Sequence, residues 1–202
     1  MRVTGGKARG LPLQAPAKGR DVRPATDRLR ESLFSSLGER VLDARVLDLF
    51  AGTGSYGLEA LSRGAGRVVF VENHRAALRC LRHNLRRVAT ACGDGPSASV
   101  RARAVLPLPL LPGERFDLAI ADPPYAQWES LRAPLLRALG PMLAEDARLV
   151  LEIPAEWRAE TPGFEEVRRL GGRQRGDPAL LLLAPSARTR ADSGLPESNS
   201  LR

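Results

Sequence analysis

One short segment constrains the fold more than any other: an apolar run that leads directly into a glycine-rich loop and then into a helical pattern. The apolar run is Val46–Phe50, the loop Gly52–Gly57 matches G-x-G-x-x-G, and Leu58–Arg63 begins a helix that Gly64 ends. Glycines at these spacings allow a tight turn and a close approach of backbone to a ligand. A strand–loop–helix unit of this kind predicts a parallel sheet covered by helices.

The rest of the chain continues this alternation and predicts an α/β fold with a doubly wound, mostly parallel sheet. A helix containing Leu29, Leu33, Phe34 and Leu37 precedes the first strand, with Thr26 as its cap and Gly38 at its end. Two later helices are expected, one capped by Asn73 and one over Leu131–Leu143. The further strands are expected at Val68–Glu72, Ser99–Val105, Asp117–Ala121, Arg148–Ile153, Glu165–Leu170 and Ala179–Ala184, the last two pairing as a hairpin.

Composition changes at both ends and divides the chain into three parts. Residues 1–22 are rich in Gly, Pro and Arg and predict a basic hairpin arm rather than a core element. Residues 23–184 form the main domain, and residues 185–202 are polar without periodicity, which predicts a disordered tail.

The charge balance favours a polyanionic partner. The formal net charge is +8, and residues 1–40 hold nine basic and four acidic side chains. Such a surface attracts nucleic acids. The absence of an apolar run of about 20 residues argues against a membrane span, and no signal-peptide pattern is present. Two cysteines and two histidines without metal-ligand spacing favour a reduced, cytoplasmic protein without a metal site.

Two carboxylates point to the ligand of the glycine-rich loop. Glu72 lies 20 residues after Gly52, at the end of the second strand, where a carboxylate can accept hydrogen bonds from ribose hydroxyls. Asp48 lies among apolar neighbours, where a carboxylate is costly unless it is paired. The α-amino group of a methionine moiety would pair with it, whereas a pyrophosphate would be repelled. S-adenosylmethionine therefore fits better than NAD, although the loop alone does not separate them.

Asp122-Pro-Pro-Tyr125 is the most informative tetrapeptide for chemistry. It follows a buried strand, so it is expected beside the cofactor loop at the carboxyl edge of the sheet. An aromatic amine is a poor nucleophile because its lone pair is delocalised into the ring. The Asp122 carboxylate and the Pro123 carbonyl can accept its N–H groups and localise that pair, while Tyr125 can stack on a base taken out of its helix.

The ordered motifs resemble those of a known family. Asp48–Gly54 resembles methyltransferase motif I, and Asp122–Tyr125 resembles motif IV of amino-group methyltransferases. Thr4–Gly10, Arg23–Phe34 and Gly57–Gly64 are similar to the bacterial 16S rRNA guanine-N2 methyltransferase family (RsmD-like). The resemblance spans roughly residues 2–184 and implies a Rossmann-like, S-adenosylmethionine-dependent methyltransferase fold with a seven-stranded sheet.

The resemblance also implies residue roles. The methionine part of the cofactor would lie on Asp48, Ala51, Gly52, Thr53 and Gly54, and the ribose region on Glu72 and Asn73; Asp122, Pro123 and Tyr125 would form the target-amine site. The chain departs from the family after the third strand, where Arg101–Ala104 offers no carboxylate or amide. Arg103 and Ala104 are therefore expected to meet the adenine mainly through backbone.

The partner implied is small-subunit ribosomal RNA, or an assembling 30S particle, bound by a monomer. The cluster expected to contact RNA phosphates is Arg9, Arg20, Arg23, Arg28 and Arg30. Arg79, Arg82 and Arg86 are instead expected on the exposed face of a helix.

Three alternatives remain open from the sequence. An adenine-N6 or DNA amino-methyltransferase would use the same tetrapeptide, although no large target-recognition insertion is present. An NAD(P)-dependent oxidoreductase would use the glycine-rich loop but leaves Asp48 and Asp122–Tyr125 without a role. A catalytically silent RNA-binding module would need neither.

Overall fold

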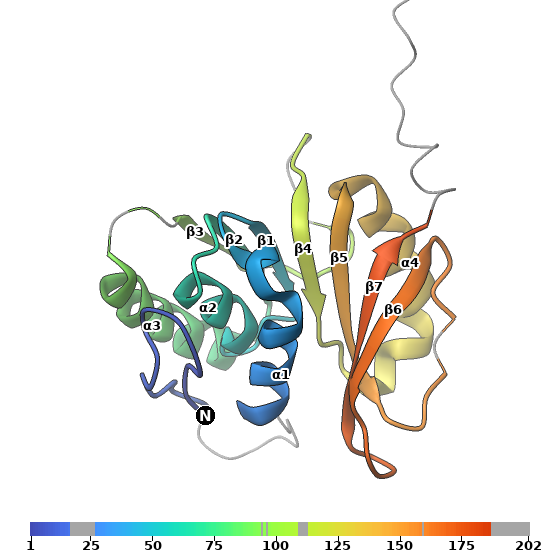
Figure 1. Cartoon of the computed structure of the whole chain (residues 1–202), viewed down its shortest axis with the longest axis horizontal. Coiled ribbons are helices and arrows are strands. Elements are labelled where there is room, and N and C mark those ends of the chain that lie inside the picture. Colours follow the sequence, from blue (N-terminus) through green and yellow to red (C-terminus); the bar gives the residue numbers. More distant parts are fainter. Residues whose placement is uncertain (17–26, 94, 96, 109–112, 159, 187–202) are drawn as a thin grey trace, which may run out of the picture.

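The computed structural model describes residues 1–16, 27–93, 95, 97–108, 113–158 and 160–186. Within them lies one seven-stranded sheet with the strand order β3-β2-β1-β4-β5-β7-β6 (Figure 1). The strands are β1 (Arg45–Leu49), β2 (Arg67–Val71), β3 (Ser97–Arg101), β4 (Phe116–Ala121), β5 (Leu143–Pro154), β6 (Phe164–Gly171) and β7 (Pro178–Pro185). Strands β1 to β5 run parallel, and β7 is antiparallel to both β5 and β6. The predicted mostly parallel sheet and its terminal hairpin are confirmed.

Helices cover both faces of this sheet. They are α1 (Asp27–Leu37), α2 (Ser55–Ser62), α3 (Arg75–Cys92) and α4 (Trp128–Leu139). Because successive strand residues point to opposite faces, Val46 packs with α1, α2 and α3, whereas its neighbour Leu47 packs with α4. Burial on both faces explains why the parallel strands read as continuous apolar runs. None of the described helices is long and apolar enough to cross a membrane.

The N-terminal segment, residues 1–16, differs from the predicted arm. Its backbone turns back on itself, with N–H to carbonyl hydrogen bonds from Val3 to Leu11 (3.0 Å) and from Leu13 to Met1 (3.1 Å), but it forms only an isolated bridge rather than strands. Val3, Ala8 and Leu13 are buried in the core cluster of α1, α2 and α3. The expectation that this segment lies outside the core was therefore wrong, because its small and apolar side chains pack against the helices.

Several boundaries also differ from the predictions. Helix α4 ends at Leu139, and a 3-10 turn over Gly140–Met142 leads into β5 at Leu143, five residues before the predicted start. The helix after β2 is capped by His74 rather than Asn73, since the His74 ring accepts the N–H of Ala77 (3.4 Å). The predicted cap Thr26 and the predicted tail beyond residue 186 lie outside the described residues.

Candidate active site

The two segments that the sequence singled out leave adjacent parallel strands at the same edge of the sheet. Strand β1 pairs with β4, with Leu49 opposite Ala121. The Asp122 N–H, one residue further, points to the Leu49 carbonyl at 3.5 Å. The loop after β1 and the turn after β4 therefore start side by side, at the point where the sheet changes winding direction and where ligands bind in folds of this class.

The loop after β1 has the backbone geometry that its glycines predict. Gly52 and Gly54 have φ values of 56° and 85°, in the left-handed region that other residues avoid. A Cβ on Gly54 would lie 2.4 Å from the Leu81 side chain, whereas one on Gly52 would meet only the Phe50 carbonyl, at 3.8 Å. The loop is thus packed against α3 on one side and leaves backbone open to a ligand at Gly52.

Glu72 ties this loop to the start of α3. Its carboxylate accepts the N–H groups of Gly52 (2.8 Å), Asn73 (2.8 Å) and His74 (2.7 Å). An ionised carboxylate has about four acceptor positions, so these three donors leave one for a ribose hydroxyl. The predicted ribose contact remains compatible with the structure, and Glu72 additionally shapes the loop.

Asp48 is a buried carboxyl group with few compensating contacts. Only 2% of the residue is exposed, and its Oδ2 accepts the N–H of Gly57 at 2.9 Å. The pKa of Asp48 is raised to about 7, chiefly by burial and also by the charge of Glu72, while the Gly57 N–H acts in the opposite direction. A ligand ammonium group would supply the positive charge that such a buried carboxylate lacks.

The turn after β4 presents a carboxyl group beside an aromatic ring. The pKa of Asp122 is raised well above its usual range, first by burial and then by the charges of Glu152 and Asp48. Tyr125 is 39% exposed, and its ring centroid lies 5.9 Å from that of Trp157. Pro123 is buried and Pro124 exposed, so the predicted target-amine residues form one turn with an open aromatic face.

The sequence reasoning missed Glu152 and Tyr56. Glu152, near the end of β5, is 1% exposed and accepts the hydroxyl of Tyr56 at 2.7 Å. Burial raises the pKa of Glu152 to about 7, and the Tyr56 hydroxyl acts in the opposite direction. A signal existed, because Leu149–Ile153 encloses a single carboxylate in an apolar strand, the same pattern that drew attention to Asp48.

The remaining cofactor residues lie around the same edge. Thr53 accepts the Asn84 side-chain amide through its carbonyl (3.1 Å), and Ala51 donates its N–H to the Val71 carbonyl (3.1 Å). Asn73 is exposed at the start of α3, and Arg103 and Ala104 are exposed just beyond β3. The backbone of Glu72 meets β3 there, since its N–H donates to the Arg101 carbonyl at 3.2 Å.

The predicted RNA-contacting arginines separate into three groups. Arg9 and Arg28 are exposed, while Arg20 and Arg23 lie outside the described residues. Arg30 is fully buried, contrary to its predicted role, because its guanidinium joins Glu59 (3.3 Å) and Asp27 (2.9 Å). It also donates to the backbone carbonyl of Arg2.

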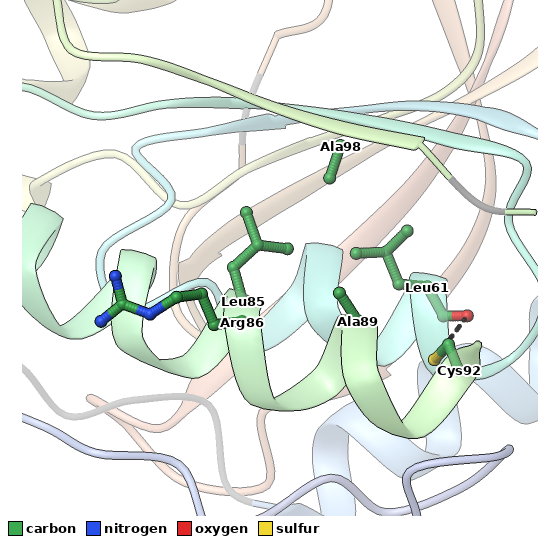
Figure 2. Close-up of a pocket in the computed structure, with 6 residues that line it drawn as sticks. All are labelled: Leu61, Leu85, Arg86, Ala89, Cys92 and Ala98. Atoms are coloured by element: carbon green, nitrogen blue, oxygen red, sulfur yellow. Dashed lines mark hydrogen bonds between the residues drawn. The ribbon is translucent and has the colours of Figure 1, made fainter. Parts of the chain in front are cut away.

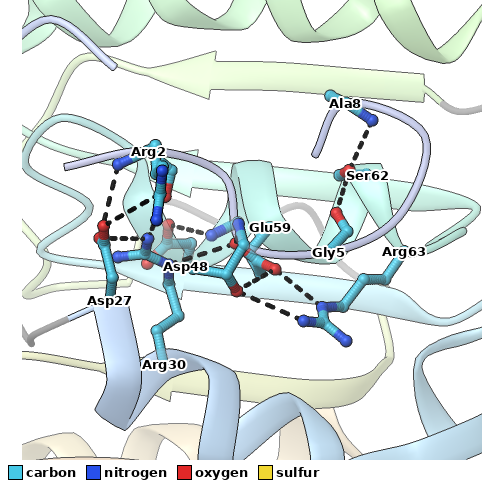
Figure 3. A network of polar contacts seen from close by, with 11 residues as sticks. Arg2, Gly5, Ala8, Asp27, Arg30, Asp48, Glu59, Ser62 and Arg63 are labelled. Carbon is cyan, nitrogen blue, oxygen red and sulfur yellow. Dashed lines mark hydrogen bonds and ion pairs between the residues drawn. The ribbon is translucent and has the colours of Figure 1, made fainter. Parts of the chain in front are cut away.

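Figure 3 shows that this network attaches the N-terminal segment to α1 and α2. Glu59 accepts the N–H of Thr4 at 2.8 Å and pairs with Arg63 at 2.8 Å. Ser62 donates to the Gly5 carbonyl at 2.6 Å and accepts the Ala8 N–H at 2.9 Å. Arg30 therefore holds the fold together and does not contact solvent.

A cavity of about 220 Å³ lies elsewhere, between the C-terminal part of α3, α2 and β3 (Figure 2). It is lined by Leu61, Leu85, Arg86, Ala89, Cys92 and Ala98. None of these residues belongs to the carboxyl edge of the sheet, so this cavity is separate from the candidate site.

Comparison with known proteins identifies the family. The chain is 33% identical over 166 residues to Ribosomal RNA small subunit methyltransferase D of Escherichia coli K12, covering 78% of this chain and 81% of that protein. A solved structure of a putative methyltransferase, yhhF, from Escherichia coli superposes with a TM-score of 0.75 at 29% identity, covering 93% of this chain and 98% of the other.

A hypothetical protein from Thermus thermophilus superposes with a TM-score of 0.72 at 37% identity, covering 91% of this chain and 99% of the other. The family model described as Conserved hypothetical protein 95 matches residues 1–182. The chain therefore belongs to this family, the RsmD-like methyltransferases that its motifs resemble.

Proposed function

We propose that this protein transfers a methyl group from S-adenosylmethionine to the exocyclic N2 of a guanine in 16S ribosomal RNA. The observation that carries the proposal is the side-by-side placement of the loop after β1 and the Asp122–Tyr125 turn after β4. The name of the Escherichia coli relative, Ribosomal RNA small subunit methyltransferase D, supports the substrate.

The residues around the loop fit this cofactor. The buried Asp48 carboxyl would take its ammonium group, the open backbone at Gly52 would face its methionine part, and the remaining acceptor position of Glu72 would take a ribose hydroxyl. The backbone of the exposed residues Arg103 and Ala104 would meet the adenine. When bound, S-adenosylmethionine supplies an electrophilic methyl group. NAD fits less well, since Asp48 would repel its pyrophosphate.

The Asp122–Tyr125 turn would prepare the amine. The Asp122 carboxylate and the Pro123 carbonyl accept its N–H groups, which localises the nitrogen lone pair. The exposed Tyr125 ring stacks on the flipped base. The amine loses one proton when it gains the methyl group, and Asp122, with its raised pKa, is the base within reach. Because the reaction needs no covalent intermediate, positioning supplies much of the rate.

The RNA would be held by basic side chains of the N-terminal part. Arg9 and Arg28 are exposed and available to phosphates, and Arg20 and Arg23 remain proposed contacts in the stretch between them. Arg30 is excluded from this set by its burial.

A labelling experiment tests the proposed function. Purified protein is incubated with methyl-labelled S-adenosylmethionine and either small ribosomal subunits or naked rRNA from a strain that lacks the enzyme, and the labelled nucleoside is identified and mapped. We expect N2-methylguanosine in small-subunit RNA. Asp122→Ala should abolish labelling while calorimetry still detects cofactor binding, and Glu165→Gln, on the exposed side of β6, should match the wild type. Label on adenine, or none, would overturn the proposal.

A further inference from the structure

Glu152 is the buried group at this site that the mechanism above does not use. Strands β4 and β5 are parallel with Ala121 opposite Leu151, so Asp122 and Glu152 follow as the next pair. Neighbouring strands lie about 4.8 Å apart, and paired residues in parallel strands point to the same face. That face is the one on which Ile120 and Val150 pack with α1, α2 and α3. The two carboxyl groups are therefore neighbours.

The contacts around Glu152 come from both segments of the candidate site. Its charge also contributes to the raised pKa of Asp122 and of Tyr125. Within the part of the chain that the structure describes, its hydrogen-bond partner is the hydroxyl of Tyr56, in the first turn of α2 directly after the cofactor loop. Past β5 the chain places Trp157 against Tyr125, so the segment after β5 packs on the Asp122–Tyr125 turn.

The buried Glu152 carboxyl group accepts the Tyr56 hydroxyl, and its other acceptor positions have no donor among the described residues. A buried carboxylate is costly unless hydrogen bonds or a cation compensate it, and the Tyr56 hydroxyl supplies one such bond. The structure thus leaves two adjacent carboxyl groups beside the Asp122–Tyr125 turn with capacity for further N–H donors.

Guanine, adenine and cytosine differ in the donors that they can offer to two adjacent carboxyl groups. Guanine presents two neighbouring donors on its Watson–Crick edge, the N1–H and the N2 amine. Adenine presents its N6 amine beside the bare lone pair of N1, and cytosine its N4 amine beside the bare lone pair of N3. A second carboxylate next to Asp122 would accept the additional donor of guanine and repel the lone pair of the other two bases.

We propose that Glu152 determines the base specificity, an inference that rests on the proposed function. Its carboxylate accepts the N1–H of guanine while Asp122 holds the N2 amine. In this arrangement Tyr56 orients the Glu152 carboxylate through its hydroxyl, and adenine is rejected because its N1 faces a carboxylate. A site that hydrogen-bonds a substrate N–H discriminates strongly against analogues that lack it.

The test pairs enzyme variants with a base analogue. RNA is prepared with either guanine or 2-aminopurine at the nucleotide mapped by the labelling experiment. 2-Aminopurine keeps the 2-amino group but lacks O6 and has a bare N1, so it lacks the donor assigned to Glu152. Because O6 is lost as well, the change in preference from the wild type to Glu152→Gln isolates the N1 contact. Methyl transfer to both RNAs is measured as kcat/KM for the wild type, Glu152→Gln, Tyr56→Phe and the surface control Glu165→Gln.

We expect the wild type and Glu165→Gln to prefer guanine by roughly 10- to 100-fold, the effect of one hydrogen bond to a charged group. In Glu152→Gln the amide oxygen can still accept the Tyr56 hydroxyl, which turns its NH2 toward N1 of the base. The guanine preference should therefore fall at least about tenfold or invert. Tyr56→Phe keeps the carboxylate, so it should lower both rates and retain most of the preference.

Each contrary outcome identifies which idea fails. If the wild type methylates the rRNA guanine but accepts 2-aminopurine equally well, the specificity assignment is overturned and the proposed function stands. The same holds if Glu152→Gln lowers both rates by one factor, as a residue that only supports Tyr56 would. If the wild type transfers no methyl group to rRNA guanine, the proposed function is overturned and the assignment with it. If the Glu152→Gln variant does not fold, equal wild-type rates on the two RNAs still overturn the assignment, whereas the change in preference between Tyr56→Phe and the wild type is then the remaining test of it.

Discussion

At the scale of single residues, the site is a set of carboxyl groups that the fold buries at one edge of its sheet. Asp48, Asp122 and Glu152 all have pKa values raised chiefly by burial. Several carboxyl groups with raised pKa values at one place mark a functional site, because apolar side chains in their positions would cost the fold less. Their cost to folding is expected to be visible in the ligand-free protein.

Stability should therefore fall as the pH rises toward neutrality. The pKa of Asp48 is near 3.8 in the unfolded chain and about 7 in the folded one, so between these values the folded state binds more protons. Protonation then stabilises the fold, and this stabilisation is lost as pH rises through about 7. Asp48→Asn keeps an acceptor for the Gly57 N–H but removes the charge.

We expect this variant to melt at a higher temperature than the wild type at about pH 8, and to differ little at about pH 5. It should also lose affinity for S-adenosylmethionine. Thermal melts and calorimetry check the two effects. A variant that is less stable than the wild type at the higher pH would contradict the account of Asp48 as a costly, functional carboxyl group.

Residues of the site could be predicted where a polar side chain interrupts an apolar pattern. Asp48 was found in this way, whereas Asp122 was found as part of the tetrapeptide that follows a buried strand. The structure places the ends of their two strands side by side. Arg30 was misplaced because a sequence does not show which arginines of a basic stretch meet buried carboxylates, and Glu59 lies 29 residues away. The Tyr56–Glu152 contact joins residues 96 positions apart, so only the folded chain reveals it.

At the scale of elements, the N-terminal segment depends on the close approach of Gly6 to the Ser62 carbonyl in α2. Gly6 has a φ of 76°, and a Cβ there would lie 1.9 Å from the Ser62 carbonyl oxygen. Gly10 has a similar φ of 85°, but its Cβ would meet nothing within 4 Å. The two glycines therefore separate the cost of backbone conformation from the cost of a clash.

Gly6→Ala should loosen the N-terminal segment and Gly10→Ala should affect it much less. The expected difference in unfolding free energy is about 1–3 kcal/mol, as for overpacking at other tight contacts. Hydrogen exchange at the Val3 and Leu13 amides, both bonded within this segment, provides the measurement. Equal effects of the two substitutions would show that the contact with α2 is not what holds the segment.

Element order was predictable, whereas several element ends were not. Strands β1, β2 and β4 were found within one residue of each boundary because they are short, buried and bounded by turns. The start of β5 was missed since Leu143–Ala147 contains the exposed residues Glu145 and Asp146 instead of forming an apolar run. The Asn73 cap was wrong because the helix begins one residue later than predicted, with His74 as its cap, and the neighbouring Glu72 carboxylate binds the Asn73 and His74 N–H groups.

At the scale of the whole molecule, the net charge of +8 predicts salt-dependent binding to RNA. Arg9 and Arg28, exposed in the N-terminal part, are the proposed phosphate contacts, and Arg79 and Arg82 are equally exposed on α3. Arg9→Gln with Arg28→Gln should reduce the slope of log affinity against log salt by about 0.7–0.9 for each contact removed. Arg79→Gln with Arg82→Gln should leave it nearly unchanged. Equal slopes in the two double variants would reject the assignment.

The proposed mechanism requires the cofactor to lie between the loop after β1 and the turn after β4. A crystal structure with S-adenosylhomocysteine, the product left after methyl transfer, tests this most directly. We predict its amino group within hydrogen-bonding distance of the Asp48 carboxyl, about 3 Å, a ribose hydroxyl on Glu72, and its sulfur facing Asp122 and Tyr125. A ligand bound at another edge of the sheet, or one whose sulfur points away from Asp122, would contradict it.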